Sequence, residues 1–285
     1  MRRITVFDYE AGNLHSLLKA IAEPGRALSV RVETDARALV SETDLLVLPG
    51  VGAFGHATAR LAPGRDEVAA ALADGLPAIG ICLGMQLLCA ASDEGAGDGL
   101  GLVPGRVRKV RARRVPQIGW NAVEWREAPP VVVSDPARSG GESPSVVLSD
   151  PTRSGGESKD LVVGEASPVV LSDPSRSGGE SKDLVVGRDR DASSPALRAF
   201  AQHDGGGPRH PTLPIAYFAN GFVCAIDPDD PCVLATTTHE ADRFASVVRV
   251  ANTIGMQFHP EKSSFDGVRF LRAMIATALG LEPVA

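Results

Sequence analysis

Short apolar segments alternate with helix-like segments through the first 92 of the 285 residues, and this alternation restricts the fold more than any other feature. Four largely apolar segments are expected to be strands: residues 3–8, 27–34, 45–48 and 76–82. Helices are expected at residues 13–25, 36–44, 64–75 and 84–92. Buried strands that alternate with helices predict a parallel sheet with helices on both faces.

The second half of the sequence has a different pattern. From about residue 100 onwards, shorter alternating runs predict a mixed or antiparallel addition to the sheet. An amphipathic helix is expected at residues 265–280. The predicted fold class is therefore α/β, with a mostly parallel central sheet, helices on both faces and a small antiparallel addition.

The middle of the chain contains repeats. Residues 145–164 recur at 168–187 with two differences, and a partial third copy begins at Val131. These units are rich in Ser, Gly, Asp, Pro and Glu, which bury too little apolar surface to offset the entropy of ordering. We expect residues 129–211 to be an inserted, mostly disordered segment, either a tolerated surface insertion, which is favoured, or a docking arm. Residues 1–128 and 212–285 would then form one domain of about 200 residues.

Composition excludes several classes of protein. The formal net charge of −6 argues against a nucleic-acid partner. Four cysteines are too few for a disulfide scaffold, and their spacing fits no zinc site. The first apolar run stops after four residues, and no segment is long enough to span a bilayer. We expect a cytoplasmic protein with no metal, no cofactor, no nucleic acid and no membrane partner.

The segment Gly80-Ile81-Cys82-Leu83-Gly84 joins an expected strand to an expected helix. Its G-x-C-x-G spacing is the thiol counterpart of the G-x-S-x-G nucleophile elbow. A helix N-terminus favours a thiolate, and the Leu83 amide would point towards an oxyanion. The spacing alone is also compatible with a buried cysteine at a tight packing turn.

A thiol nucleophile needs a base, and His259 is the best candidate among six histidines. The segment "GMQFHPEKS" ends an apolar strand, with Glu261 two residues after His259. Residues i and i+2 of an extended segment lie on one side, so Glu261 can contact the imidazole. Isolated histidines are usually structural, but His-Pro-Glu at the end of a strand favours catalysis.

A glycine-rich turn follows another expected strand. Pro49-Gly50-Val51-Gly52 can present consecutive backbone amides to an anion. It lacks the Lys-Ser/Thr pair of a phosphate-binding P-loop. Because the carboxyl ends of parallel strands meet at one edge of a sheet, this turn is expected beside Cys82, as half of an oxyanion hole.

Together, "GICLGMQ", "PGVGAF" and "QFHPEKS", in this order, resemble the class I (triad) glutamine amidotransferases, whose fold is flavodoxin-like. "DYEAGN", "VPQIGWN" and "GMQFHPEKSS" are most similar to one branch, the glutaminase subunits of imidazole glycerol phosphate synthase in histidine biosynthesis. The resemblance covers residues 1–128 and about 212–285. Three positions depart from the usual pattern of that branch: Glu10 replaces glycine, Gln117 replaces histidine, and Asn220-Gly221-Phe222 replaces a His-Ser/Thr-Tyr segment.

The resemblance implies an activity and a set of roles. Cys82 would attack the glutamine amide, His259 would move the proton and Glu261 would orient His259. Glutamate and ammonia would be the products, with ammonia passing to a (β/α)₈ cyclase subunit in a heterodimer that makes imidazole glycerol phosphate and AICAR. The remaining roles would fall to oxyanion and glutamine-binding residues Gly50, Val51, Gly52, Leu83 and Gln86, and to docking residues Asn13, Gln117, Trp120 and Asn121. The alternative is a non-catalytic, amidotransferase-like subunit that binds a partner through the same face.

Overall fold

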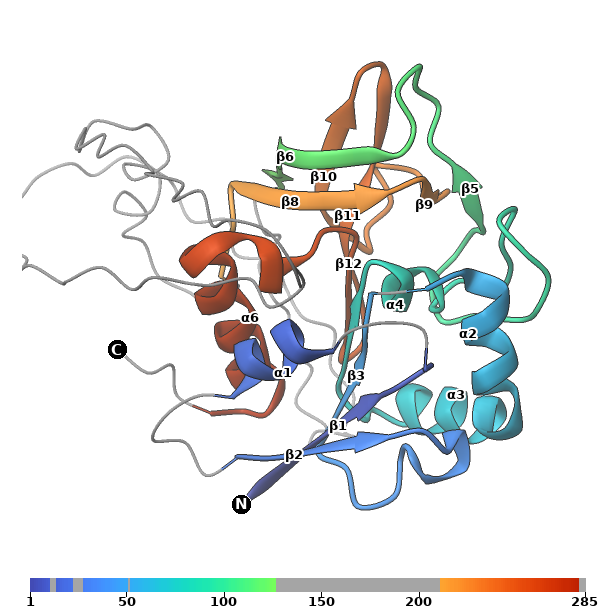
Figure 1. Ribbon diagram of the computed structural model, residues 1–285, viewed down its shortest axis with the longest axis vertical. Helices are drawn as coiled ribbons and strands as arrows, with labels where there is room; N and C mark the ends of the chain where they lie inside the picture. Colours follow the sequence, from blue (N-terminus) through green and yellow to red (C-terminus); the bar gives the residue numbers. More distant parts are fainter. Residues whose placement is uncertain (11–13, 23–27, 51, 127–210, 282–285) are drawn as a thin grey trace, which may run out of the picture. The chain divides into compact units, whose positions relative to one another are not determined.

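The computed structural model of the chain describes residues 1–10, 14–22, 28–50, 52–126 and 211–281. An eight-stranded sheet runs through them in the order β2-β1-β3-β4-β12-β11-β10-β7 (Figure 1). Its first five strands are parallel: β2 (Leu28–Glu33), β1 (Arg2–Phe7), β3 (Leu45–Leu48), β4 (Ala78–Ile81) and β12 (Thr253–Met256). The predicted parallel sheet is confirmed, and β12 extends it beside β4.

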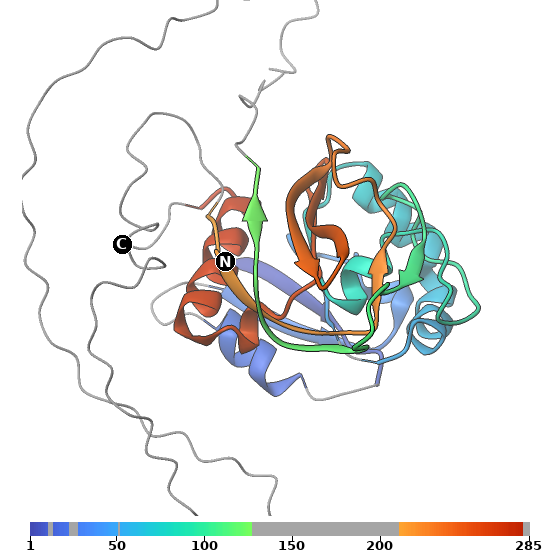
Figure 2. The same ribbon diagram turned by 90° about the horizontal axis from the view of Figure 1, so that it is seen from above.

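Antiparallel strands complete the structure, as the second half of the sequence predicts. The large sheet ends in β11 (Asp242–Val250), β10 (Val233–His239) and β7 (Glu124–Trp125). Two strand pairs lie outside it: β5 (Val107–Lys109) with β9 (Phe222–Cys224), and β6 (Gln117–Ala122) with β8 (Ile215–Asn220). In Figure 2, β6 (green) and β8 (orange) run side by side.

Helices cover both faces of the sheet, as predicted. The main ones are α1 (His15–Ile21), α2 (Phe54–Leu61), α3 (Arg65–Ala73) and α6 (Ser264–Ala278). Because side chains alternate along a strand, Val47 packs in a core with α1 and α6, whereas Leu46 and Leu48 pack with α2 and α3. Figure 1 shows α1 and α6 together on one side of the sheet, and α2 and α3 on the other.

Some expected helices differ from the observed ones. The helix expected at 36–44 is a single 3₁₀ turn, η1 (Ala36–Ala38), and α2 was not expected. Instead of residues 84–92, the helix after Cys82 covers only α4 (Leu83–Gln86). It stops because the loop that returns over it takes its next carbonyls: Leu100 N donates to Leu87 O, and Val103 N donates to Leu88 O.

The turn between β10 and β11 holds the basic segment that precedes β6. Asp242, which is 6% exposed, accepts two hydrogen bonds from the Arg108 guanidinium, at 2.7 and 2.8 Å, and one from the Arg111 amide. Glu240 accepts hydrogen bonds from the backbone amides of Arg113 and Arg114. This segment is therefore attached to the large sheet by two carboxylates immediately before β6 begins.

The strands on either side of the repeats are neighbours. Ala122 of β6 pairs with Ile215 of β8, and the Trp125 indole donates to Leu213 O at 2.9 Å. The predicted insertion at 129–211 lies outside the described residues except for Pro211. The described residues on the two sides of this gap, up to 126 and from 211, therefore lie close to each other.

Candidate active site

Cys82 occupies a sharp turn between β4 and α4, the arrangement that the G-x-C-x-G spacing predicts. Its backbone has φ +48° and ψ −102°, a region that non-glycine residues rarely adopt. A Cβ atom on Gly84 would lie 1.9 Å from Leu48 O, and one on Gly80 would lie 2.7 Å from Gly84 O. Only glycine fits on either side of this strained cysteine. Since α4 is a single turn, its dipole contributes little at the sulfur.

His259 and Glu261 form a buried pair beside Cys82. The Nδ1 atom of His259 lies 2.8 Å from Oε1 of Glu261, and the two side chains are 3% and 7% exposed. Glu261 lies in η3 (Pro260–Lys262), directly after the histidine. With Nδ1 engaged by the carboxylate, Nε2 is the nitrogen available for proton transfer.

The charge state of His259 depends on its two acidic neighbours. Burial opposes protonation of the imidazole, but the negative charges of a Cys82 thiolate and the Glu261 carboxylate outweigh burial and raise the pKa of His259 to about 10. The two side chains also both lie against Gly50, so a charged sulfur would act on the imidazolium at short range. Thiolate–imidazolium pairs are typical of cysteine nucleophiles.

We expect Cys82→Ala to lower the pKa of His259, because the substitution removes the thiolate charge from beside the imidazole. Nitrogen NMR titration of the His259 ring measures this pKa directly, and Thr253→Val, at the start of β12, is the matched control. A raised pKa also stabilises the fold: the contribution is complete below the unfolded pKa of about 6.5 and is lost as the pH rises towards 10. An unchanged pKa in Cys82→Ala would mean that the two side chains are not paired.

The backbone of His259 is held by β8. The His259 amide donates to Tyr217 O at 2.9 Å, and the Tyr217 amide donates to Oγ of Ser263 at 2.9 Å. The Ser263 hydroxyl in turn donates to His259 O at 2.6 Å. These bonds fix the loop that carries the histidine against a strand from another part of the sequence.

Gly50 packs against both candidate catalytic side chains. A Cβ atom there would lie 2.9 Å from the Cys82 Cβ and 3.0 Å from Cε1 of His259. Gly52 has φ +108°, a conformation that favours glycine. The turn after β3 therefore lies beside Cys82, as expected, although Val51 itself is outside the described residues.

Gln86 and Leu83 both lie on α4. Leu83 is the first residue of the helix and is buried. Gln86 is 4% exposed, and its Nε2 atom donates to Phe222 O at 2.9 Å and to Oε1 of Gln257 at 3.4 Å. Gln257, which sequence reasoning did not single out, contacts Cys82 directly. The sequence feature that could have identified Gln257 is its position two residues before His259, at the end of an apolar strand.

The predicted docking residues differ in how exposed their side chains are. Trp120 is 56% exposed on β6, next to Ile118 at 68%, and its ring meets the Tyr217 ring edge-on at 6.1 Å. Gln117 is buried beneath this face, with no hydrogen-bond partner for its side chain in the described part of the chain. Asn121 is partly buried and donates to Thr238 O. Asn13 lies outside the described residues.

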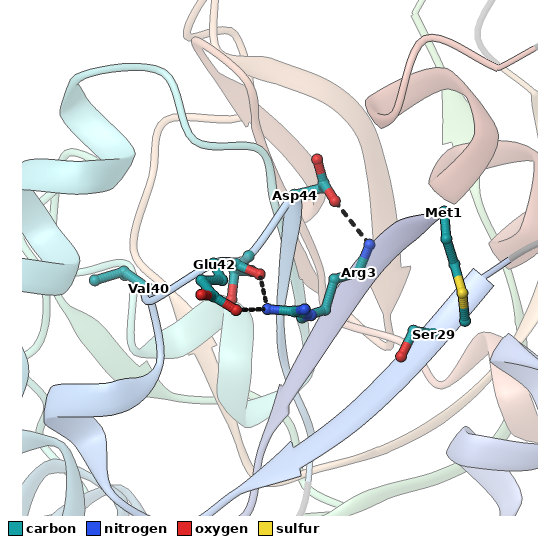
Figure 3. A pocket seen from close by; sticks show the side chains of 7 residues that line it. Met1, Arg3, Ser29, Val40, Glu42 and Asp44 are labelled. Carbon is teal, nitrogen blue, oxygen red and sulfur yellow. Dashed lines mark hydrogen bonds and ion pairs between the residues drawn. The ribbon is translucent and has the colours of Figure 1, made fainter.

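A surface hollow lies at the amino ends of β1 and β2 (Figure 3). It is lined by Met1, Arg3, Ser29, Val40, Glu42, Thr43 and Asp44. The Arg3 guanidinium pairs with Glu42, and its backbone amide donates to Asp44. Because Cys82 follows the carboxyl end of a parallel strand, this hollow is at the opposite end of the sheet from Cys82 and is not part of the candidate active site.

Metal-binding clusters and membrane-spanning helices are both absent from the described part of the chain. No group of three or more His, Cys, Asp or Glu side chains is arranged to hold a metal ion within the residues that the structure covers. No helix among those residues has the length and apolar character needed to cross a membrane.

The sequence matches known proteins along almost its whole length. The family model for class I glutamine amidotransferases matches residues 5–128. Proteins named imidazole glycerol phosphate synthase subunit HisH are 30% identical in Synechocystis, over 95% of this chain and 94% of the relative, and in Halobacterium salinarum, over 95% and 92%. A HisH subunit of Thermus thermophilus is 49% identical over 123 residues, covering 42% of this chain and 61% of the relative.

Solved structures with low identity share the fold. A glutamine amidotransferase has a TM-score of 0.55 at 12% identity, covering 98% of this chain and 99% of its own. A protein from Thermoplasma acidophilum, described as part of a GMP synthase, has a TM-score of 0.50 at 16% identity, covering 98% and 95%. Taking the fold and the long 30% matches together, the chain is a glutamine amidotransferase that belongs to the HisH family of imidazole glycerol phosphate synthase subunits.

Proposed function

We propose that this chain is the glutaminase subunit of imidazole glycerol phosphate synthase and that Cys82, His259 and Glu261 are its catalytic triad. The observation that carries the proposal is the local geometry. A strained cysteine at the end of β4 lies beside a buried histidine, which is itself 2.8 Å from a buried carboxylate. A buried thiol, imidazole and carboxylate in this order support nucleophilic acyl transfer.

The reaction proceeds in two steps. The Cys82 sulfur attacks the side-chain amide carbon of glutamine, and His259 protonates the departing nitrogen, so that ammonia leaves and a thioester remains. Water then attacks the thioester carbon while His259 accepts a proton, which releases glutamate and regenerates the sulfur nucleophile. Glu261 holds Nδ1 of His259 throughout and stabilises the imidazolium.

The oxyanion of each step needs hydrogen-bond donors. In this proposal the backbone amides of Val51 and Leu83 donate to it, and Gly50 and Gly52 allow the turn after β3 to approach the substrate. Gln86 contributes to glutamine binding together with the segment Asn220–Phe222, whose Phe222 carbonyl it holds. Asn220 also donates from Nδ2 to that carbonyl, so the residues that replace the usual His-Ser/Thr-Tyr segment form an ordered wall beside α4.

The ammonia passes to a (β/α)₈ cyclase subunit, which uses it to make imidazole glycerol phosphate and AICAR. The names of the HisH relatives support such a partner, because they describe a subunit of a synthase. The exposed apolar side chains of β6, Ile118 and Trp120, form the docking face in this proposal. Asn13 and Asn121 contribute at its edge in this proposal. Gln117 lies beneath it, and its side-chain amide, which has no hydrogen-bond partner among the described residues, can bond to the partner or to ammonia.

Trp120→Ala is expected to weaken the complex with the cyclase subunit at least about tenfold, because large aromatic residues dominate interface energies. Isothermal titration calorimetry measures the change. Val32→Ala, which shortens a 43%-exposed apolar side chain on the far edge strand β2, is the matched control and should bind normally. Normal binding by Trp120→Ala would place the docking face elsewhere.

The test of the whole proposal is glutamate release from glutamine by the chain alone, and by the chain mixed with the cyclase subunit and its nucleotide ligand. We expect strong release in the mixture. A stable complex that releases no glutamate, with or without ligand, would instead support the non-catalytic partner-binding subunit.

Replacing residues 129–211 by a short Gly-Ser linker is expected to leave glutamate release within about twofold of the original. The flanking strands β6 and β8 are hydrogen-bonded to each other without the repeats, and the entropy of closing a loop changes slowly with its length. Activity of the shortened chain with the cyclase subunit measures the effect. A large loss would favour the docking-arm interpretation of the repeats over the tolerated insertion.

A further inference from the structure

Gln257 is a buried polar residue that the proposed triad does not use. It follows β12, two residues before His259, and its side chain is 0% exposed. Its Nε2 atom donates to the Cys82 sulfur at 3.5 Å. The contact follows from the sheet, because β12 and β4 are parallel neighbours in which Met256 pairs with Ile81 and the Cys82 amide donates to Met256 O.

The hydrogen-bond network fixes which end of the Gln257 amide faces the sulfur. The Phe222 carbonyl can only accept, so the end of the Gln86 amide that lies 2.9 Å from it must be the NH₂ group. The second hydrogen of that group points to Gln257, whose facing atom must therefore be the oxygen. This leaves the NH₂ group of Gln257 directed at Cys82.

We propose that Gln257 is a further catalytic residue, which donates a hydrogen bond to the Cys82 sulfur and so favours its negatively charged form. Gln86 is the positioning residue that holds Gln257 in this orientation. The inference deepens the proposed function and rests on it, since it assigns a second partner, besides His259, to the same nucleophile. A hydrogen bond to a charged acceptor stabilises that form more than the neutral thiol.

The chain of amides also connects the nucleophile to the glutamine-binding wall. Phe222 O, Gln86 and Gln257 form a continuous series of hydrogen bonds that ends at the Cys82 sulfur. All of the side chains in this series are at least nine-tenths buried, so water does not compete for these bonds. Displacing the Phe222 carbonyl would therefore alter the environment of the sulfur without any direct contact.

The test is the pH dependence of Cys82 alkylation by iodoacetamide, which reports the charged sulfur and needs no glutamine turnover. Gln257→Glu keeps the shape and the bond from Gln86 but places a carboxylate beside the sulfur. Its alkylation midpoint should rise by one pH unit or more, on the order of a like charge in contact. Gln257→Leu removes the donor to the sulfur, together with the oxygen that accepts from Gln86, and should raise the midpoint less. Thr253→Val, a buried change at the start of β12, is the control, and Cys82→Ala gives the background from the other cysteines.

Because the new carboxylate of Gln257→Glu raises the midpoint whether or not Gln257 donates, the decisive variant is Gln257→Leu. A midpoint of Gln257→Leu within about 0.2 pH units of the original would overturn the inference. If either variant fails to fold, NMR of the original chain decides: the Gln257 side-chain amide protons should shift as Cys82 titrates, and unshifted signals overturn the inference. The two proposals remain separable. A raised midpoint in a chain that releases no glutamate would uphold Gln257 and reject the glutaminase, whereas glutamate release with unmoved midpoints would do the reverse.

Discussion

Cys82→Ala is expected to lower glutamate release by the complex with the cyclase subunit at least about a thousandfold, because removal of the nucleophile eliminates the thioester route. The loss should appear in the turnover number rather than in binding of the cyclase, since Cys82 is only 6% exposed and lies beside β4, away from the exposed face of β6. A coupled glutamate assay, together with calorimetry of complex formation, separates the two effects.

Cys232→Ala is the matched control for this experiment. Burial, together with Asp230, raises the pKa of the Cys232 thiol to about 12, so this cysteine is a neutral thiol at the pH of the assay. It should release glutamate at the original rate. If Cys82→Ala retained about a tenth or more of the activity, Cys82 would not be the nucleophile, and its strained backbone would need another explanation.

Gly50→Ala should produce the second large effect, at least about a hundredfold loss of glutamate release. The added methyl group would lie 2.8 Å from Ile81 O as well as in contact with Cys82 and His259, so something must shift. Two of these three neighbours are backbone or Cβ atoms that cannot rotate away, and separation of sulfur from imidazole is the remaining adjustment. Overpacking of this kind also costs about 1–3 kcal/mol of unfolding free energy.

The control for this substitution is Gly280→Ala. Unlike Gly50, Gly280 has a positive φ, +62°, but an added Cβ there meets no atom of the described residues within 4 Å. It therefore reproduces the loss of a glycine without the collision, and glutamate release should be unchanged. If Gly50→Ala were as active as Gly280→Ala, the turn after β3 would not be packed against the catalytic pair. Thermal unfolding of both variants separates loss of stability from loss of geometry.

The sequence was sufficient to predict the parallel sheet, because β3 and β4 are uniformly apolar and helical segments separate the strands. It could not predict the length of α4. Amides of a loop more than ten residues further on donate hydrogen bonds to the carbonyls of Leu87 and Leu88, and no local sequence pattern predicts these bonds. By contrast, α2 could have been predicted, since Phe54, Ala57, Thr58 and Leu61 follow the helical spacing i, i+3, i+4, i+7 and are all buried.

The candidate site likewise has one contact that a local pattern predicts and one that depends on residues far apart in the sequence. The pairing of His259 with Glu261 follows from a spacing of two residues and was predictable. The proximity of His259 to Cys82 depends on β12 lying next to β4, which are about 170 residues apart in sequence. The need of a thiol for a base and the resemblance to a family suggested it, but no local pattern did. Period-two alternation along β6 would have separated the exposed Trp120 from the inward Gln117 and Asn121, had it been applied to them.

The two carboxylates that hold the segment before β6, Glu240 and Asp242, make this attachment sensitive to acid. The hydrogen bond from the Arg113 amide holds the pKa of Glu240 below its usual range. Burial would raise the pKa of Asp242, but its bonds from Arg108 and Arg111 outweigh burial and lower it. Groups with lowered pKa values contribute stability that is lost only as the pH falls through the acidic range. The attachment of β6 through these two carboxylates therefore weakens in acid, whereas the charge of His259 changes only as the pH approaches 10.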